Sequence, residues 1–298
     1  MIVIGSRGSQ LALWQARHIA AKLAELGAET RLEIIKTTGD KILDVPLAKV
    51  GGKGLFTKEI EEALLARTID LAVHSLKDVP AELPAGLTLS AIPEREDPRD
   101  ALVGRSLAEL SNGAKIGTSS LRRSAQLYAL GRGFVTETLR GNVDTRLRKL
   151  DEGQYDAIVL AAAGLRRLGW ADRIREMIPV EIMCPAVGQG SLAIETRDDG
   201  GEAQGLVGKL DHPATRAAVT AERALLATLG GGCQVPIGGH ARVENGNIHL
   251  RALVAAPDGS RIVRGERTGT DAEAIGRALG QELLDRGARE ILKEVYAA

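Results

Sequence analysis

The sequence predicts an α/β protein with two lobes, followed by a smaller C-terminal α+β domain. Three observations lead to this fold class. Short apolar runs alternate with segments of helical periodicity, which is typical of α/β domains. A charged, proline-bracketed segment at residues 93–100 and a second interruption at 184–190 break this alternation, as expected where a chain crosses between domains. Beyond residue 238 the alternation is replaced by three strands and two closing helices.

The composition bounds the class of protein before any motif is considered. The 298 residues allow two or three domains, and 44% hydrophobic residues are enough to build their cores. A net charge of zero and an isoelectric point near 7.0 argue against binding to nucleic acids. No apolar run reaches the length of a membrane span, and the first residues lack the apolar core of a signal peptide. We therefore expect a cytoplasmic protein with neither a nucleic-acid nor a membrane partner.

The first lobe is expected to comprise residues 1–95 and 190–210. Its strands are predicted from the apolar runs at 2–4, 32–35, 69–75, 87–92 and 191–196. Its helices are predicted between Ser9, which can cap the first of them, and Gly27, and then at 57–65 and 202–210. The glycine- and lysine-rich segment 37–56 lacks phosphate-loop spacing, and loops of this length are usually functional or disordered. We interpret it as a mobile lid that carries cations.

One carboxylate in this lobe lies where ligands usually bind. In open α/β sheets, ligands bind at the carboxyl ends of the strands, and Asp78 follows the strand at 69–75 with Lys77 beside it. A turn-forming aspartate just before a proline is the alternative interpretation. His74 lies inside the strand, and we expect a core histidine whose hydrogen bonds are satisfied.

The second lobe is expected to comprise residues 96–189. Its predicted strands lie at 115–117, 135–139 and 157–161, and its predicted helices at 121–130, 143–150 and 162–168. Hydroxyl side chains and the adjacent Arg122 and Arg123 open the first helix, an arrangement that suits an anion. A solvated basic face is the alternative. Arginines recur just past the strand ends, and this placement is not explained by the general excess of arginine over lysine.

The C-terminal domain, residues 211–298, carries the second of two cysteines. A helix at 214–229 is followed by the glycine-rich stretch 230–239, which contains Cys233. Glycines permit positive φ and close approach of other atoms, so this loop suits a thiol that carries a bulky group; an ordinary turn with a chance cysteine is the alternative. Strands at 238–243, 248–255 and 261–268 and helices at 272–286 and from 288 complete the domain.

Neither a disulfide framework nor a metal site is expected. Cys184 and Cys233 are far apart and form no CxxC pair, and the five histidines form no HExxH motif. No internal repeat is evident. Two crossings between two α/β lobes suggest the architecture of a periplasmic binding protein with a ligand cleft. The residue pattern by itself therefore predicts a two-lobed cleft protein with an anionic ligand.

Four motifs, taken together and in order, resemble the hydroxymethylbilane synthase family, also called porphobilinogen deaminases. They are the segments 74–80 (HSLKDVP), 117–123 (GTSSLRR), 139–142 (LRGN) and 231–238 (GGCQVPIG). The resemblance covers nearly the whole chain. It implies two lobes like those of type II periplasmic binding proteins around a central cleft, with a third domain that carries the cysteine.

The resemblance also implies the reaction of a transferase in porphyrin and heme biosynthesis. Family members hold a dipyrromethane cofactor by a thioether to the loop cysteine, here Cys233. Porphobilinogen loses ammonia, and the free carbon of the terminal pyrrole attacks the resulting electrophile. Four rounds extend the chain, and hydrolysis releases the linear tetrapyrrole hydroxymethylbilane. Every ring carries an acetate and a propionate, so charge-assisted bonds from arginine suit this chain.

Residue roles follow from the same resemblance, which implies a monomer with Asp78 as the catalytic carboxylate and Cys184 as a packing residue. The matching cofactor-binding positions are Cys233, Lys77, Asp78, Ser119, Ser120, Arg122, Arg123, Arg146, Asp40 and Gly190. The matching substrate-binding positions are Arg7, Ser75, Arg140, Arg146, Arg167, Gln15, Lys49, Lys53, Phe56 and Gln189.

Two other classes of protein remain open at this stage. A solute-binding protein with the same lobes would bind its ligand reversibly and leave Cys233 unmodified. A hydrolase would use Cys233 as nucleophile with His240, but a seven-residue spacing through a glycine–proline turn makes that geometry unfavourable. The intact mass of the protein separates the three, because only the synthase carries two covalently attached pyrrole units.

Overall fold

The computed structural model describes residues 1–41, 56–231 and 235–297, with only the backbone of Asp40 and Lys41. The chain divides into two units, and each is described by itself. The first unit is Met1–Glu96 with Ser191–Arg216, and the second is Asp97–Gly190 with Ala217–Ala298. The division into three domains and the cleft between the lobes stay predictions.

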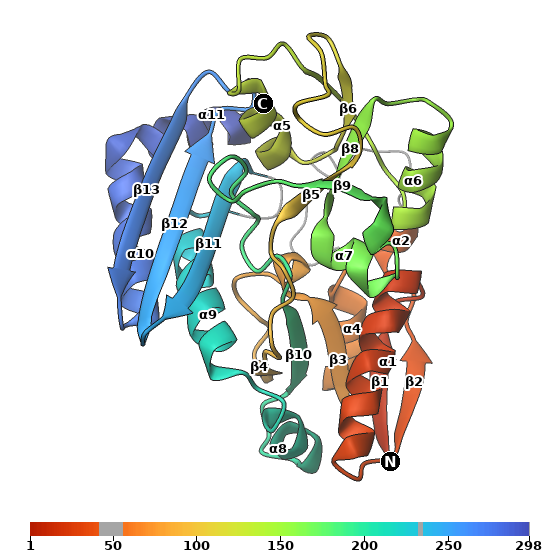
Figure 1. Ribbon diagram of the computed structural model, residues 1–298. Helices are drawn as coiled ribbons and strands as arrows, with labels where there is room; N and C mark the ends of the chain where they lie inside the picture. The colour runs from red at the N-terminus through yellow and green to blue at the C-terminus, as the bar shows by residue number, and fades with distance from the viewer. Residues whose placement is uncertain (42–55, 232–234, 298) are drawn as a thin grey trace. The chain divides into compact units, whose positions relative to one another are not determined.

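The first unit is built on a five-stranded mixed sheet with the order β2-β1-β3-β10-β4 (Figure 1). β1 pairs in parallel with β2 and β3, whereas β10 runs antiparallel to β3 and β4. The elements of this unit are β1 (Ile2–Ser6), α1 (Gln10–Glu25), β2 (Thr30–Ile34), α2 (Thr38–Lys41), α4 (Lys58–Leu65), β3 (Leu71–Ser75), η1 (Leu76–Asp78), β4 (Leu87–Ala91), β10 (Leu192–Arg197) and α8 (Glu202–Gly208).

Strand alternation gives this sheet two buried faces. Ile19 of α1 packs with Leu71 on one face, while Ile60 of α4 packs with Ala72 on the other. α1 begins where predicted, because the Ser9 hydroxyl accepts a hydrogen bond from the backbone N–H of Ala12 (3.3 Å). Both helices therefore support β3, whose carboxyl end leads directly into η1.

The first sheet of the second unit has the order β7-β6-β8-β5-β9. β6 pairs in parallel with β7 and β8, and β5 runs antiparallel to β8 and β9. This pairing matches that of the first unit strand for strand, a structural repeat that the sequence does not reveal. The elements are β5 (Asp100–Gly104), β6 (Lys115–Gly117), α5 (Leu121–Tyr128), β7 (Val135–Glu137), α6 (Val143–Asp151), β8 (Ala157–Ala161), α7 (Ala162–Arg167), η2 (Ala171–Arg173) and β9 (Ile174–Met177).

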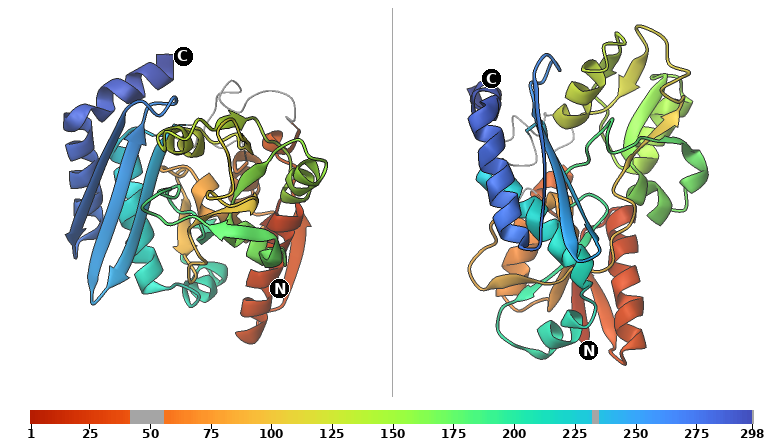
Figure 2. Two further views of the ribbon diagram at one scale, coloured as in Figure 1. Left: turned by 45° about the horizontal axis from the view of Figure 1, so that its top comes forward. Right: turned by 60° about the vertical axis from the view of Figure 1, so that its left-hand side comes forward.

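The second unit also contains the antiparallel sheet β11-β12-β13, with α10 against one of its faces (Figure 2). Its first hairpin turns at Asn245 and Gly246, both with positive φ, as the Asn-Gly pair predicts. The elements are α9 (Pro213–Thr228), which belongs to this unit from Ala217 on, β11 (Ile237–Glu244), β12 (Asn247–Ala255), β13 (Ile262–Gly269), α10 (Ala272–Leu283), η3 (Leu284–Ala288) and α11 (Arg289–Ala297).

The predicted fold class of α/β lobes with a C-terminal α+β domain is confirmed, but two strands escaped prediction. β5 follows the charged crossing directly and has only Ala101, Leu102 and Val103 as an apolar run. β9 has no continuous apolar run at all. The sequence pattern of these two strands does not separate them from the loops beside them. No helix in the described parts of the chain is both long and apolar enough to cross a membrane.

Candidate active site

Asp78 lies in a tight turn at the carboxyl end of β3. The backbone N–H of Leu76 donates to the carbonyl of Ser191 (3.0 Å), and that of Val79 donates to the carbonyl of Leu76 (3.1 Å). The side chain of Leu76 is buried, whereas Lys77 and Asp78 are half-buried. No described residue donates a hydrogen bond to the Asp78 carboxylate. A fixed backbone therefore presents a carboxylate that retains its capacity to accept hydrogen bonds.

The residues next to this turn are held by specific contacts. Gln15 of α1 is buried, and its amide donates to the hydroxyl of Ser75 (2.8 Å). The guanidinium of Arg7 lies over the ring of Phe56, 4.2 Å from its centroid, in a cation–π contact. The structure thus pairs four of the predicted substrate-binding residues with one another, two by two.

His74 faces the opposite side of β3 from Ser75. Its Nε2 lies 3.0 Å from Oε2 of Glu195, and both side chains are buried. The prediction of a core histidine with a satisfied hydrogen bond is confirmed. Glu61 lies in the same interior, where burial raises the pKa of its carboxyl group.

Arg122 and Arg123 form a buried cluster with Asp100 at the start of β5. Arg122 Nη1 donates to Asp100 Oδ2 (2.7 Å) and to the carbonyl of Cys184 (2.7 Å). Arg123 donates to Asp100 Oδ1 through Nε (3.0 Å) and Nη2 (2.7 Å), and to the carbonyl of Val159 (2.9 Å). The two arginines are only 4% and 6% exposed. The alternative interpretation of a solvated basic face therefore does not describe these two side chains.

The charges within this cluster do not cancel. Burial alone would raise the pKa of Asp100, but the two guanidinium groups outweigh it and hold that pKa well below its usual range. Burial lowers the pKa of Arg123 against the opposing effect of Asp100. Two guanidinium groups against one carboxylate leave an excess of positive charge, so a further anion is electrostatically favoured there.

Serine side chains near the cluster do not point to a helix cap. The Ser119 hydroxyl exchanges hydrogen bonds with the backbone of Leu139, donating to its carbonyl (2.8 Å) and accepting from its N–H (3.1 Å). Ser120 is the N-cap residue of α5, yet its hydroxyl makes no capping bond. These contacts hold the 139–142 segment beside the start of α5.

The remaining predicted residues of the second lobe mainly contact backbone. Arg146 Nε donates to the carbonyl of Gly141 (2.8 Å), and Arg167 Nη2 donates to that of Gly190 (2.6 Å). Gln189 is buried and donates to Asp100 Oδ1 (3.0 Å) and to the carbonyl of Pro98 (2.7 Å). Gln189 therefore belongs to the buried cluster, a position that does not expose its amide to a substrate. Arg140 is half-buried.

Several predicted residues cannot be placed. Lys49, Lys53 and Cys233 lie outside the described residues, as does the side chain of Asp40. The other cysteine, Cys184, is fully buried, and burial raises the pKa of its thiol to about 12. Such a thiol is unreactive near neutral pH, in line with the packing role expected of it.

Sequence reasoning missed Asp100 as a site residue. It stands in the charged run 93–100, which reads as a crossing, and nothing local distinguishes it from its acidic neighbours. A signal existed in the two adjacent arginines at 122 and 123, because buried guanidinium groups require a carboxylate. The sequence does not say which carboxylate it is.

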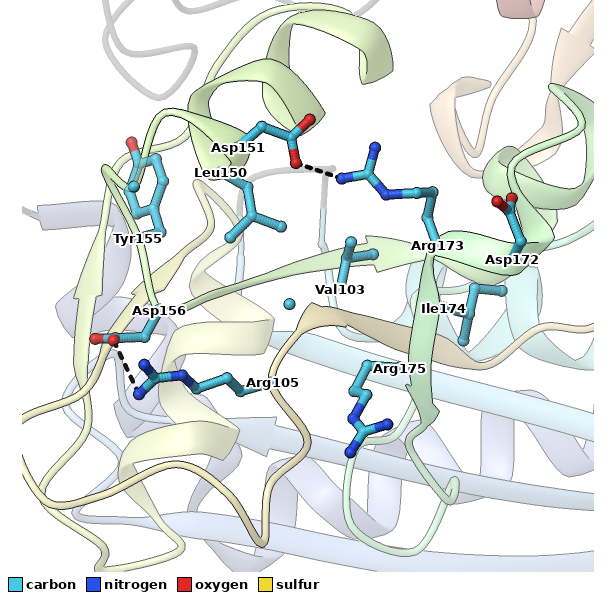
Figure 3. A pocket seen from close by; sticks show the side chains of 12 residues that line it. Val103, Arg105, Leu150, Asp151, Tyr155, Asp156, Asp172, Arg173, Ile174 and Arg175 are labelled. Atoms are coloured by element: carbon cyan, nitrogen blue, oxygen red, sulfur yellow. Dashed lines mark hydrogen bonds and ion pairs between the residues drawn. The ribbon is translucent and has the colours of Figure 1, made fainter.

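A hollow of about 730 Å³ lies elsewhere in the second unit (Figure 3). Ion pairs line it, Arg105 with Asp156 (3.3 Å) and Arg173 with Asp151 (2.6 Å). It contains no predicted site residue and has no excess of one charge. We do not assign the active site to this hollow, because most of its charged groups already have partners.

Comparison with known proteins identifies relatives along the whole chain. A family model described as the dipyromethane cofactor binding domain of porphobilinogen deaminase matches residues 2–204, and one for the C-terminal domain of the same enzyme matches residues 216–285. A porphobilinogen deaminase from Syntrophobacter fumaroxidans is 55% identical over 305 aligned positions, which cover 100% of this chain and 99% of the relative.

Solved structures with a similar trace are more distant in sequence. A periplasmic substrate-binding protein of an ABC transporter from Coxiella burnetii is 13% identical, with a TM-score of 0.44 over 75% of this chain and 97% of that one. A TRAP periplasmic solute-binding protein from Desulfovibrio salexigens is 11% identical, with a TM-score of 0.42 over 70% and 72% of the two chains.

Proposed function

The chain belongs to the porphobilinogen deaminase family, and from that premise we propose which of its residues carry out the reaction. The enzyme is a hydroxymethylbilane synthase with a dipyrromethane cofactor. It joins four porphobilinogen molecules head to tail, releases ammonia and produces the linear tetrapyrrole hydroxymethylbilane. A solute-binding protein and a cysteine hydrolase, which the sequence left open, are therefore set aside.

The buried arginine cluster fits the acidic side chains of the cofactor. When bound, the cofactor supplies the ring carbon to which the growing chain is added. The hydrogen bonds that fix Arg122 use Nη1, and no described residue accepts a hydrogen bond from its Nη2 or Nε, so these two groups are candidates for binding cofactor carboxylates. Each charge-assisted bond of this kind contributes about 1.5–3 kcal/mol. We assign cofactor binding to this cluster, with Ser119, Ser120 and Arg146 beside it.

Asp78 is the residue to which we assign catalysis. A carboxylate that accepts hydrogen bonds from pyrrole N–H groups stabilises the positive charge that develops when ammonia leaves. It also takes up the proton that the new ring releases, or passes it on. The observation that carries this assignment is the anchored turn, which fixes the backbone at Leu76 and leaves the Asp78 carboxylate half-buried.

The other assignments follow from chemistry and position. Arg7, Arg140 and Arg167 bind substrate carboxylates together with the other substrate-binding residues predicted above, except Gln189, whose amide is taken up in the buried cluster. Cys233 carries the thioether, because the buried Cys184 thiol cannot reach a bulky group. We further propose that the enzyme acts as a monomer in the cytoplasm.

Substitution of Asp78 tests the central assignment. Asp78→Asn keeps the shape and removes the charge, which is worth about 3–4 kcal/mol in a water-poor site, so turnover should fall at least about a hundredfold. Asp78→Glu keeps the charge in a displaced position and should retain more activity. Turnover is measured by single-round condensation of porphobilinogen, and intact mass confirms normal cofactor content. Near-normal condensation by the Asn variant would show that Asp78 only forms the turn.

The attachment site is tested separately. Cys233→Ser should lack the two-pyrrole mass and should be inactive, because a hydroxyl is a much poorer nucleophile than a thiolate. Peptide mapping that finds this mass on Cys184 would contradict the assignment.

A further inference from the structure

Glu222 of α9 is a buried acid that the mechanism above does not use. Its side chain is completely shielded from solvent, and its two oxygens accept hydrogen bonds from different parts of the second unit. Oε2 accepts from the backbone N–H of Gly188 (2.7 Å), and Oε1 accepts from that of Ala241 in β11 (2.7 Å). Bonds this short are typical of an ionised acceptor. Removing a carboxylate from water costs free energy, and hydrogen bonds of this kind are needed to offset that cost.

Gly188 belongs to the crossing segment, which we define as residues 184–190. At one end of the segment, the carbonyl of Cys184 accepts hydrogen bonds from Arg122 Nη1 (2.7 Å) and Gln126 Nε2 (3.2 Å). The N–H of Cys184 donates to Gln126 Oε1 (2.7 Å). The position of this end therefore sets the direction in which the Arg122 guanidinium points.

The other end of the crossing segment contacts the same cluster. Gln189 donates to Asp100 Oδ1, and Gly190 accepts from Arg167. A segment of seven residues thus contacts Arg122, Arg167 and the Asp100 carboxylate. A shift of this segment would move all three contacts at once.

The crossing segment also packs tightly against β11. The N–H of Gly239 donates to the carbonyl of Pro185 (2.9 Å). A Cβ atom at Gly238 would lie 3.0 Å from Cys184 Cβ, and one at Gly239 would lie 2.9 Å from Val187. Only glycine allows this approach, so β11, the crossing segment and Glu222 form one closely fitted contact.

We propose that Glu222 is a positioning residue for cofactor binding. It ties α9, the helix that leads to Cys233, to the crossing segment whose Cys184 carbonyl and Gln189 amide orient the arginine cluster. The proposal rests on the proposed function, in which that cluster binds the carboxylates of the cofactor. It adds that a residue which touches neither cofactor nor substrate sets the affinity for both.

Three variants of the full-length enzyme test this. Glu222→Gln keeps the volume but opposes an amide N–H to one of the two backbone donors, and Glu222→Asp keeps the charge on a shorter side chain. Leu279→Ala removes buried volume from α10 and serves as the control for lost stability alone. Thermal unfolding gives the stability of each variant. Intact mass gives the fraction loaded with cofactor and, after limiting porphobilinogen, the distribution of added rings.

The fraction of Glu222→Gln that carries the cofactor should be at least about tenfold lower than in the wild type, as is typical when a residue that orients binding side chains is replaced. Glu222→Asp should recover part of this loading. Leu279→Ala should lose stability and still load fully. Normal loading of Glu222→Gln, or equal loss in the Leu279→Ala control, overturns the proposal. The variant Arg122→Leu separates this inference from the proposed function. If Arg122→Leu loads poorly while Glu222→Gln loads normally, only the role of Glu222 is contradicted. If Arg122→Leu loads normally, the assignment of cofactor binding to the arginine cluster is contradicted as well.

Discussion

In the first unit the strand β10 begins at Leu192, which lies opposite Ser75 at the end of β3. In the second unit the equivalent strand β5 begins at Asp100, which lies opposite Ala161 at the end of β8. The strand orders are the same, and both residues are buried. The same sheet position is thus occupied by a leucine in the first lobe and by an aspartate in the second lobe.

The helices that follow the first strand of each lobe differ in the same way. Counted from the N-cap serine, α1 has Leu11 and Ala12 at the second and third positions, whereas α5 has Arg122 and Arg123. The first lobe shows that a sheet with this strand order folds with apolar residues at these positions. The charged trio of the second lobe is therefore not required by the fold, and buried ion pairs are often no more stable than apolar replacements. This difference favours retention of the trio for binding.

The comparison can be broken by placing apolar residues at all three positions of the second lobe. The variant Asp100→Leu/Arg122→Leu/Arg123→Met should fold with about the stability of the wild type, because no buried charge is left unpaired. Its cofactor loading should fall at least about tenfold, since it loses guanidinium–carboxylate bonds of about 1.5–3 kcal/mol each. Intact mass and urea unfolding measure the two properties. Full loading would assign the trio to structure alone.

Arg167→Leu is the matched comparison for that experiment. Arg167 is half-buried and contacts the backbone of Gly190, outside the charged trio. We expect this variant to load the cofactor and to stall during elongation, seen as enzyme-bound chains of intermediate length. If both variants load alike and turn over normally, the two arginine roles are not divided as proposed.

A single substitution sharpens the same comparison through stability. Asp100→Leu leaves two buried guanidinium groups without their carboxylate, which should cost about 3–5 kcal/mol of unfolding free energy. In the wild type the pKa of Asp100 is lowered by folding, so its stabilisation is complete above the unfolded value of about 3.9 and is lost as the pH falls further. Urea unfolding between pH 7 and pH 3 should show this loss in the wild type and not in the triple variant. A flat wild-type profile would argue against it.

The smallest effect is expected at Cys184. With a pKa raised to about 12, roughly one Cys184 thiol in ten thousand is ionised at pH 8. The native holoenzyme should therefore resist iodoacetamide for hours, and the unfolded holoenzyme should expose one reactive thiol. Cys184→Ala should change turnover less than about twofold. Rapid alkylation of native Cys184 would mean that the crossing segment opens readily.

The sequence predicts the lobes well because their longer strands carry clear apolar patterns, as at 69–75. It also places Asp78 just past a strand end and His74 inside the strand, because the apolar run shows where that strand lies. It cannot show that Arg122 is buried, because the partner Asp100 is 22 residues away on a strand that continues directly from the charged crossing and is not recognised as a strand. The repeat of strand order is invisible for a related reason. Pairing is set by contacts across the sheet, and the residues compared above differ between the two lobes.

The place of β10 in the first sheet has a consequence for the growing polypeptide. β10 (Leu192–Arg197) lies between β3 and β4, although about 100 residues separate it from β4 in the chain. All strands of the second lobe, by contrast, lie within the continuous stretch from Asp100 to Met177. At a synthesis rate of roughly 5–20 residues per second, the first lobe waits about 5–20 s for its inner strand. The lobe made second on the ribosome can thus complete its sheet first, while the lobe made first keeps two unpaired strand edges until the chain returns.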